Sequence, residues 1–328
     1  MVKFCDHTFA LFDHEFADHA SHMCMIKDRA RCLGYFEQIK KHCKDKVVID
    51  FGAGTGILGI YAALCGAKEV WFCENQTNLH ETIKELCEAN NVTNYKIIAD
   101  VTTAPKNYFD VCVSETIGDC CIEQNFTRLY SDLIANNPGC IAIPDNLRIY
   151  YSTLWLDEIE KEKKYIEEFP INLKIPMLYP LPGLRPTRLD DKPVDNKFLL
   201  FSLNLHEYPK EPDLRLIFEN PKTKDHNFMV FHWKAFCKGD EFVSNDPGRS
   251  SDNFNHWCQL GFAMPQDDRL GVKLDIQRGP FVLCGNPHDD FVNDPIEYDR
   301  KYYVPSPDQF VKDTNPFQSK DGVIKWTV

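Results

Sequence analysis

Short apolar runs alternate with helix-period segments in the first half of the chain. The run VVIDF at residues 47–51 predicts a buried parallel strand, because such strands are covered on both faces and are apolar almost throughout. Residues 57–65 then predict a helix that ends at Gly66. Further strands are predicted at residues 70–73, 95–98 and 108–114, with a helix over 78–90. This alternation is typical of an α/β fold with a doubly wound parallel sheet.

The pattern changes near Pro144, where strands follow one another with only turn residues between them. This spacing predicts an antiparallel β domain. A charged stretch over residues 157–168 predicts a solvated helix, and six prolines within residues 170–193 predict an extended loop. We expect the strands of this domain at residues 147–154, 198–205, 214–218, 228–236, 257–262 and 270–276.

Three segments follow from these patterns. Residues 1–45 are polar with apolar positions at helical spacing and predict an N-terminal helical cap. Residues 46–145 form the predicted Rossmann-like domain, and residues 146–328 form the predicted β domain.

Charge and cysteine content narrow the classes of partner. The net charge of −12 is spread over both halves, which argues against direct binding to nucleic acid or to an anionic membrane. No apolar run is long enough to span a membrane, and the first twenty residues lack the apolar core of a signal peptide. Fourteen cysteines without C-x-x-C spacing favour reduced, buried thiols over a zinc site. We therefore expect a cytoplasmic protein without a metal, a nuclear location remaining open.

The strongest motif is DFGAGTG, which runs from Asp50 to Gly56 between the first strand and the first helix. Glycines at such a turn let the backbone bend sharply and approach a ligand closely. Glu74 ends the next strand, where a carboxylate can accept hydrogen bonds from both hydroxyls of a ribose. The combination predicts a nucleoside cofactor site.

In this motif and its surroundings, the sequence resembles the class I S-adenosylmethionine-dependent methyltransferases, and more narrowly the protein arginine methyltransferase family. Four segments carry the resemblance in order: MIKDRAR at 25–31, the glycine-motif region at 48–74, SETIG at 114–118 and NHW at 255–257. The resemblance implies S-adenosylmethionine as cofactor and a Rossmann-like domain followed by a β-barrel. It also implies a helical dimerisation arm, whose place residues 157–193 occupy.

The resemblance also assigns roles to single residues. Arg31 matches the arginine that pairs with the carboxylate of the cofactor, while Asp28 and His256 match a pair that links the N-terminal helix to the barrel. The cofactor-binding set it implies is His22, Met25, Arg31, Asp50, Gly52, Gly54, Gly56, Glu74 and Val101.

The family holds the substrate guanidinium between two glutamates nine positions apart, and this sequence retains one of them. Charge-assisted hydrogen bonds from both acids orient a nitrogen towards the methyl sulfonium. Glu115 matches the first acid, but the second position falls on Gln124, whose amide presents donors to a guanidinium that is itself all donor. Glu123 could restore the charge only if the loop shifted by one residue, and we interpret it as a surface acid.

Other departures lie around the same site. Phe12 and Phe16 stand where the family usually has two tyrosines, so both hydroxyls are lost. Thr116 and Ile117 replace a usual Trp-Met pair, and Thr102 stands where an acid often lies near the adenine.

Three functional readings remain open. We favour a catalytically impaired, prozyme-type subunit that activates an active arginine methyltransferase paralogue in a heteromer acting on arginine-rich proteins. The second reading is an active arginine methyltransferase, with a homodimer as the alternative assembly, supported by the intact Arg31, Glu74 and His256. The third is a methyltransferase for another acceptor, against which the β domain and His256-Trp257 count.

Overall fold

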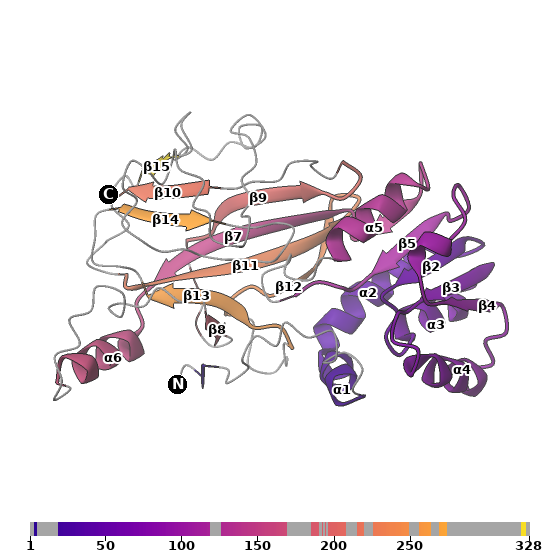
Figure 1. The fold of residues 1–328 in the computed structure, drawn as a ribbon, viewed down its shortest axis with the longest axis horizontal. Helices are drawn as coiled ribbons and strands as arrows, with labels where there is room; N and C mark the ends of the chain where they lie inside the picture. Colours follow the sequence, from indigo (N-terminus) through magenta and orange to yellow (C-terminus); the bar gives the residue numbers. More distant parts are fainter. Residues whose placement is uncertain are drawn as a thin grey trace.

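The structure described is a computed structural model. Its helices and strands form two blocks (Figure 1). Helices and a parallel sheet lie at one end, and long antiparallel strands extend from them towards helix α6 (Asp157–Glu167) at the other end (Figure 1). The structure describes residues 3–4, 19–118, 126–168, 185–189, 192, 194, 196–207, 215–219, 226–248, 256–263, 269–273 and 323–325.

The first block is a five-stranded sheet in the order β4-β3-β2-β5-β6, with all neighbouring strands parallel. Every residue of the central strand β2 is buried, which explains why its sequence VVIDF is apolar except for Asp50. The strands are β2 (Val47–Phe51), β3 (Glu69–Cys73), β4 (Tyr95–Ile98), β5 (Val111–Ser114) and β6 (Ile141–Ile143).

Five helices accompany this sheet in the described part of the chain. One of them, α2, begins at Asp28, whose carboxylate accepts the backbone N–H of Arg31 at 3.0 Å. Another, α3, begins at Gly56, which has a positive φ of 83°. The five are α1 (His19–Lys27), α2 (Arg29–His42), α3 (Ile57–Leu64), α4 (Leu79–Ala89) and α5 (Phe126–Ala135).

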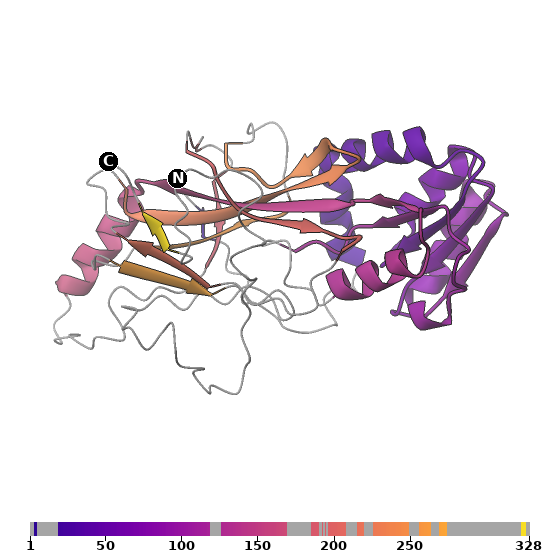
Figure 2. The same cartoon turned by 90° about the horizontal axis from the view of Figure 1, so that it is seen from above.

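The second block contains a sheet in the order β1-β8-β13-β11-β7-β9, with β12 also paired to β11. All of its neighbouring strands are antiparallel. A smaller sheet has the order β14-β10-β15 (Figure 2). The strands are β1 (Lys3–Phe4), β7 (Asn146–Leu154), β8 (Arg185–Arg188), β9 (Phe198–Asn204), β10 (Arg215–Glu219), β11 (Phe228–Cys237), β12 (Asp240–Ser244), β13 (Gln259–Ala263), β14 (Arg269–Lys273) and β15 (Val323–Lys325).

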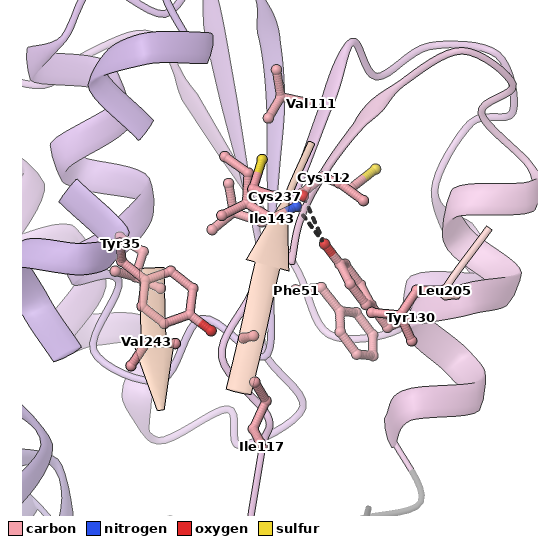
Figure 3. Close-up of a cluster of buried hydrophobic side chains, with 14 of the residues drawn as sticks. Tyr35, Phe51, Val111, Cys112, Ile117, Tyr130, Ile143, Leu205, Cys237 and Val243 are labelled. Atoms are coloured by element: carbon pink, nitrogen blue, oxygen red, sulfur yellow. Dashed lines mark hydrogen bonds between the residues drawn. The ribbon is translucent and has the colours of Figure 1, made fainter. Parts of the chain in front are cut away.

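The two blocks share one hydrophobic core. Strand β6 leads into β7 through Asp145, whose N–H donates to the Phe236 carbonyl and whose carbonyl accepts the Leu205 N–H, both at 2.9 Å. In Figure 3, Tyr35 of α2 and Val243 of β12 lie in the same cluster as residues of the parallel sheet. The Tyr130 hydroxyl ties β5 to β6 in that cluster, because it donates to the Cys112 carbonyl at 2.7 Å and accepts the Ile143 N–H at 3.1 Å (Figure 3).

The expected order, a Rossmann-like parallel sheet followed by an antiparallel β domain, is confirmed. Two details are wrong. Strand β8 lies inside residues 170–193, which we expected to form a loop, and residues 3–4 form β1 rather than part of a helical cap. Both strands obtain their hydrogen bonds from partners far away in the sequence, β1 from β8 and β8 from β13, which a local pattern does not reveal.

Two further findings concern the cysteines and the helices. All ten described cysteines are free, and seven of them are buried. No helix among the described residues has the length and apolar character that crossing a membrane requires.

Candidate functional site

The glycine loop after β2 is closely covered by side chains from other elements. Gly52, Gly54 and Gly56 all have positive φ, a conformation that favours glycine. A Cβ atom on Gly54 would lie 2.6 Å from the His22 ring on α1, and one on Gly52 would lie 2.4 Å from the methyl group of Thr116. The loop therefore needs glycine for packing as well as for its backbone shape.

Glu74, at the end of β3, fastens this loop. Its buried carboxylate accepts the Gly54 N–H at 2.7 Å through one oxygen and the Gln76 N–H at 2.8 Å through the other. Because each carboxylate oxygen has a second lone pair, both can also accept a hydroxyl. The ribose-binding role of Glu74 stays a prediction, and the remaining acceptor lone pairs of its carboxylate suit that role.

Asp50 lies beneath the loop as a fully buried acid. One carboxylate oxygen accepts the Gly59 N–H at 2.8 Å, and the other has no hydrogen-bond partner in the described part of the molecule. Burial raises the pKa of Asp50 to about 7, with Glu74 and Glu115 acting in the same direction. Hydrogen bonding from Gly59 and the charge of Arg31 only partly oppose this rise.

Arg31 and Glu115 form a buried ion pair. The Arg31 Nε donates to Glu115 Oε2 at 2.9 Å, and Nη2 makes a shorter contact with the same oxygen. Desolvation lowers the pKa of Arg31, but the Glu115 carboxylate outweighs it and the net pKa is raised. The structure thus joins the cation expected to hold the cofactor carboxylate to the acid expected to hold the substrate guanidinium.

Asp28 links α2 to the β domain. One of its carboxylate oxygens caps α2, and the other accepts the backbone N–H of His256 at 3.1 Å and lies 3.0 Å from His256 Nδ1. Burial raises the pKa of Asp28, but the hydrogen bonds from His256 and Arg31 outweigh it and the net pKa is lowered. The pairing implied by the resemblance is present, while its part in catalysis stays a prediction.

The segment 114–118, which carries Glu115, is held from two sides. The Tyr35 hydroxyl donates to the Ser114 carbonyl at 3.0 Å from the side of α2. From the β domain, the Trp257 indole donates to the Ile117 carbonyl at 2.7 Å, and the Trp233 indole donates to the Gly118 carbonyl at 3.0 Å. Sequence reasoning missed Tyr35 and Trp233, because an aromatic residue in an apolar segment is indistinguishable from a core residue.

The remaining predicted residues divide into two groups. Met25 lies on α1 with its sulfur 3.9 Å from Arg31 Nη2, and Val101 begins a 3-10 turn over Val101–Thr103. Thr102 donates to the Asp100 carboxylate through its N–H and its hydroxyl. Gln124, Glu123, Phe12 and Phe16 lie outside the described residues.

The side chains and backbone groups around the glycine loop suit a nucleoside attached to an amino acid better than they suit a metal ion. Arg31, paired with Glu115, is a cation that suits a carboxylate, and Glu74 supplies acceptors for hydroxyls. Gly52, Gly54 and Gly56 have the positive φ values of a sharp glycine turn. Within the described ranges, no group of His, Cys, Asp and Glu side chains could hold a metal ion.

Comparison with known proteins points in the same direction. The family model for ribosomal protein L11 methyltransferase (PrmA) matches residues 29–133. Protein arginine N-methyltransferase 8-B of Danio rerio is 32% identical over 144 residues, 41% of this chain and 34% of that protein. Protein arginine N-methyltransferase 1 of Dictyostelium discoideum is 28% identical over 258 residues, 73% of this chain and 74% of that protein.

Among solved structures, the fold is similar to that in the enzyme–prozyme heterotetrameric complex of Trypanosoma brucei PRMT1 with AdoHcy. The TM-score is 0.64 at 18% identity, and the match covers 80% of this chain and 91% of the other. Of the two sequence relatives, the chain spans about a third of the zebrafish protein and about three quarters of the Dictyostelium protein.

Proposed function

We propose that this chain, which resembles the protein arginine N-methyltransferases, is an arginine-methyltransferase-like subunit with impaired catalysis of its own. It binds S-adenosylmethionine at the glycine loop and activates an arginine methyltransferase paralogue in a heteromer. One observation supports the proposal: Gln124 stands at the position where the resemblance implies the second guanidinium-binding acid, while Glu115 is paired with Arg31 inside the chain.

Cofactor binding is supported by the chemistry of the loop. S-adenosylmethionine supplies the methyl group when it is bound. Arg31, which pairs with Glu115 in the ligand-free chain, would bind its carboxylate, and Glu74 would accept hydrogen bonds from its ribose hydroxyls. The glycine loop would provide its backbone contacts. The matched PrmA model and the AdoHcy named with the trypanosome complex support the same cofactor class.

Impairment follows from the charge balance around the substrate nitrogen. A guanidinium stays protonated at neutral pH, so two carboxylates hold it better than one carboxylate and an amide. Removing one preorganised polar partner from an active site costs about 10²- to 10³-fold in rate. A chain with Glu115 alone therefore methylates slowly or not at all.

The proposed heteromer with an active paralogue is supported by the similarity of the fold to a known complex. The trypanosome complex joins an enzyme to a prozyme, and this chain shares its fold. Helix α6, in the place of the dimerisation arm, projects at the end of the molecule away from the parallel sheet (Figure 1). Such a projecting element suits an intersubunit contact.

A methylation assay tests the proposal directly. The purified chain, its Glu115→Gln variant, an active paralogue from the same source, and the mixture are incubated with radiolabelled S-adenosylmethionine and an arginine-rich peptide. We expect background transfer by the chain alone and at least about tenfold more transfer by the mixture than by the paralogue.

Robust transfer by the chain alone that Glu115→Gln abolishes would overturn the proposal. It would establish the second candidate, an active arginine methyltransferase, which the intact Arg31, Glu74 and Asp28–His256 pair favour. Separately, calorimetry with S-adenosylmethionine reports whether the cofactor site is functional in either case.

A further inference from the structure

Two tryptophans of the β domain hold the backbone directly after Glu115. Trp233 lies on β11, and Trp257 lies just before β13. Their ring centroids are 4.7 Å apart with an interplanar angle of 79°, and both side chains are buried. Because they donate to the consecutive carbonyls of Ile117 and Gly118, they fix two peptide units together rather than one.

Trp233 is itself firmly anchored. Its backbone N–H donates to Asn245 Oδ1 at 2.7 Å, and its carbonyl accepts the Asn245 N–H at 3.1 Å. Asn245 is fully buried and donates from its amide to the Cys258 carbonyl at 2.8 Å, next to Trp257. The two indoles thus have a common support, so a displacement of one is transmitted to the other.

The contacts that start at Glu115 lead through neighbouring residues back to its own backbone segment. Glu115 pairs with Arg31, whose helix begins at Asp28, and Asp28 binds His256. The His256 ring lies 4.0 Å from the ring of the adjacent Trp257, and Trp257 returns to the backbone at Ile117, two residues from Glu115. A change of charge at Glu115 therefore reaches the tryptophans by two routes, through the backbone and through Arg31.

We propose that Trp233 is a positioning residue for Glu115, acting together with Trp257. Its indole N–H holds the segment after Glu115 so that this carboxylate faces Arg31, and it couples the state of the site to the β domain. The inference rests on the proposed function only in treating Glu115 as the substrate-binding acid. The coupling itself requires no cofactor, substrate or partner.

The first arm of the test uses the ligand-free chain labelled with ¹⁵N at the indole nitrogens of its five tryptophans. Glu115→Gln removes the charge and keeps the shape. We expect it to move the indole N–H resonances of Trp233 and Trp257 by more than their linewidths, while that of the exposed Trp155 stays in place. Glu81→Gln, at an exposed α4 residue paired with Lys84, is the matched control and moves none of the three.

The second arm reads the coupling in the opposite direction. Trp233→Phe removes the indole donor and keeps an aromatic ring, with Trp155→Phe as control. We expect only Trp233→Phe to shift the Nε–H resonance of Arg31, because the Nε–H donates to Glu115.

The spectra of Glu115→Gln test the proposal even if the Trp233→Phe variant fails to fold. Unmoved Trp233 and Trp257 resonances in Glu115→Gln would overturn the proposal. That outcome is distinct from failure of the proposed function, which is read from methyl transfer in the mixture and not from these spectra.

Discussion

Asp28 and Asp50 are both buried acids near the glycine loop, yet the structure moves their pKa values in opposite directions. Asp28 accepts three hydrogen bonds from Arg31 and His256, which outweigh its desolvation and lower its pKa. Asp50 accepts one, from Gly59, and desolvation raises its pKa to about 7. Hydrogen bonds and the neighbouring His256 therefore prevail over desolvation at Asp28, whereas desolvation prevails at Asp50.

Asp28→Asn is expected to destabilise the chain by about 1–3 kcal/mol at pH 7, since Asn still caps α2 but presents donors to His256. A lowered folded-state pKa gives stability that is present above the unfolded pKa of about 3.9 and is lost as the pH falls. The difference from wild type therefore shrinks below about pH 4. Urea unfolding at pH 7 and at about pH 3 measures this difference, with the exposed Asp132→Asn as control. An equal difference at both pH values would contradict the prediction.

Asp50→Asn is expected to behave in the opposite way. A raised folded-state pKa means that the folded chain keeps a proton which the unfolded chain releases, so wild-type stability falls as the pH rises from about 4 to about 7. Asn cannot titrate, and it can retain an acceptor for the Gly59 N–H. In urea unfolding without ligand, the variant should gain stability relative to wild type over that window and then level off. A gap independent of pH would show that Asp50 has an ordinary pKa.

How much of the site the sequence could predict depends on how each residue acts. Asp28 and His256 were found through motifs whose order resembles a known family, and the structure joins them at 3.0 Å. Trp233 acts through an indole that reaches Gly118, 115 positions away in the chain. No local pattern records such a contact, so a three-dimensional structure is needed to find it.

At the scale of elements, strands with strong apolar patterns were the predictable ones. Strands β2 and β4 coincide with the expected residues 47–51 and 95–98. By contrast β12, with the sequence DEFVS, and β6, only three residues long, carry too little periodicity to be recognised. Their positions are fixed by neighbours, β12 by β11 and β6 by β5.

The contact between α2 and β12 depends on the absence of a side chain at Gly34. A Cβ atom there would lie 2.1 Å from the carbonyl oxygen of Phe242, which belongs to the backbone and cannot rotate away. We expect Gly34→Ala to destabilise the chain by about 2–3 kcal/mol, although alanine favours helices by about 1 kcal/mol over glycine. Leu33→Ala, at a half-exposed position of the same helix, is the control, with an expected effect within about 0.5 kcal/mol. Denaturant unfolding measures both, and a stabilised Gly34→Ala would refute the tight contact.

At the scale of the whole molecule, the parallel sheet and the large antiparallel sheet share one buried core. Val48 and Ile49 of β2 belong to the same buried cluster as Met229 and Trp233 of β11. The connection through Asp145 is hydrogen-bonded on both sides rather than being a free linker.

We expect the two sheets to unfold together because neither can keep its core without the other. Native-state hydrogen exchange measured on peptides from β3 and β11 should give the same free energy of opening. An opening of β11 several kcal/mol easier than that of β3 would show instead two independently stable domains.

The pairing of Arg31 with Glu115 affects the electrostatic cost of the ligand-free state. In many binding sites, departure of a charged ligand strands an opposite charge in a poorly hydrated place, and the empty state is penalised. Here the two groups that would face such ligands neutralise each other. The ligand-free form therefore leaves neither Arg31 nor Glu115 as an isolated buried charge, and it avoids that penalty.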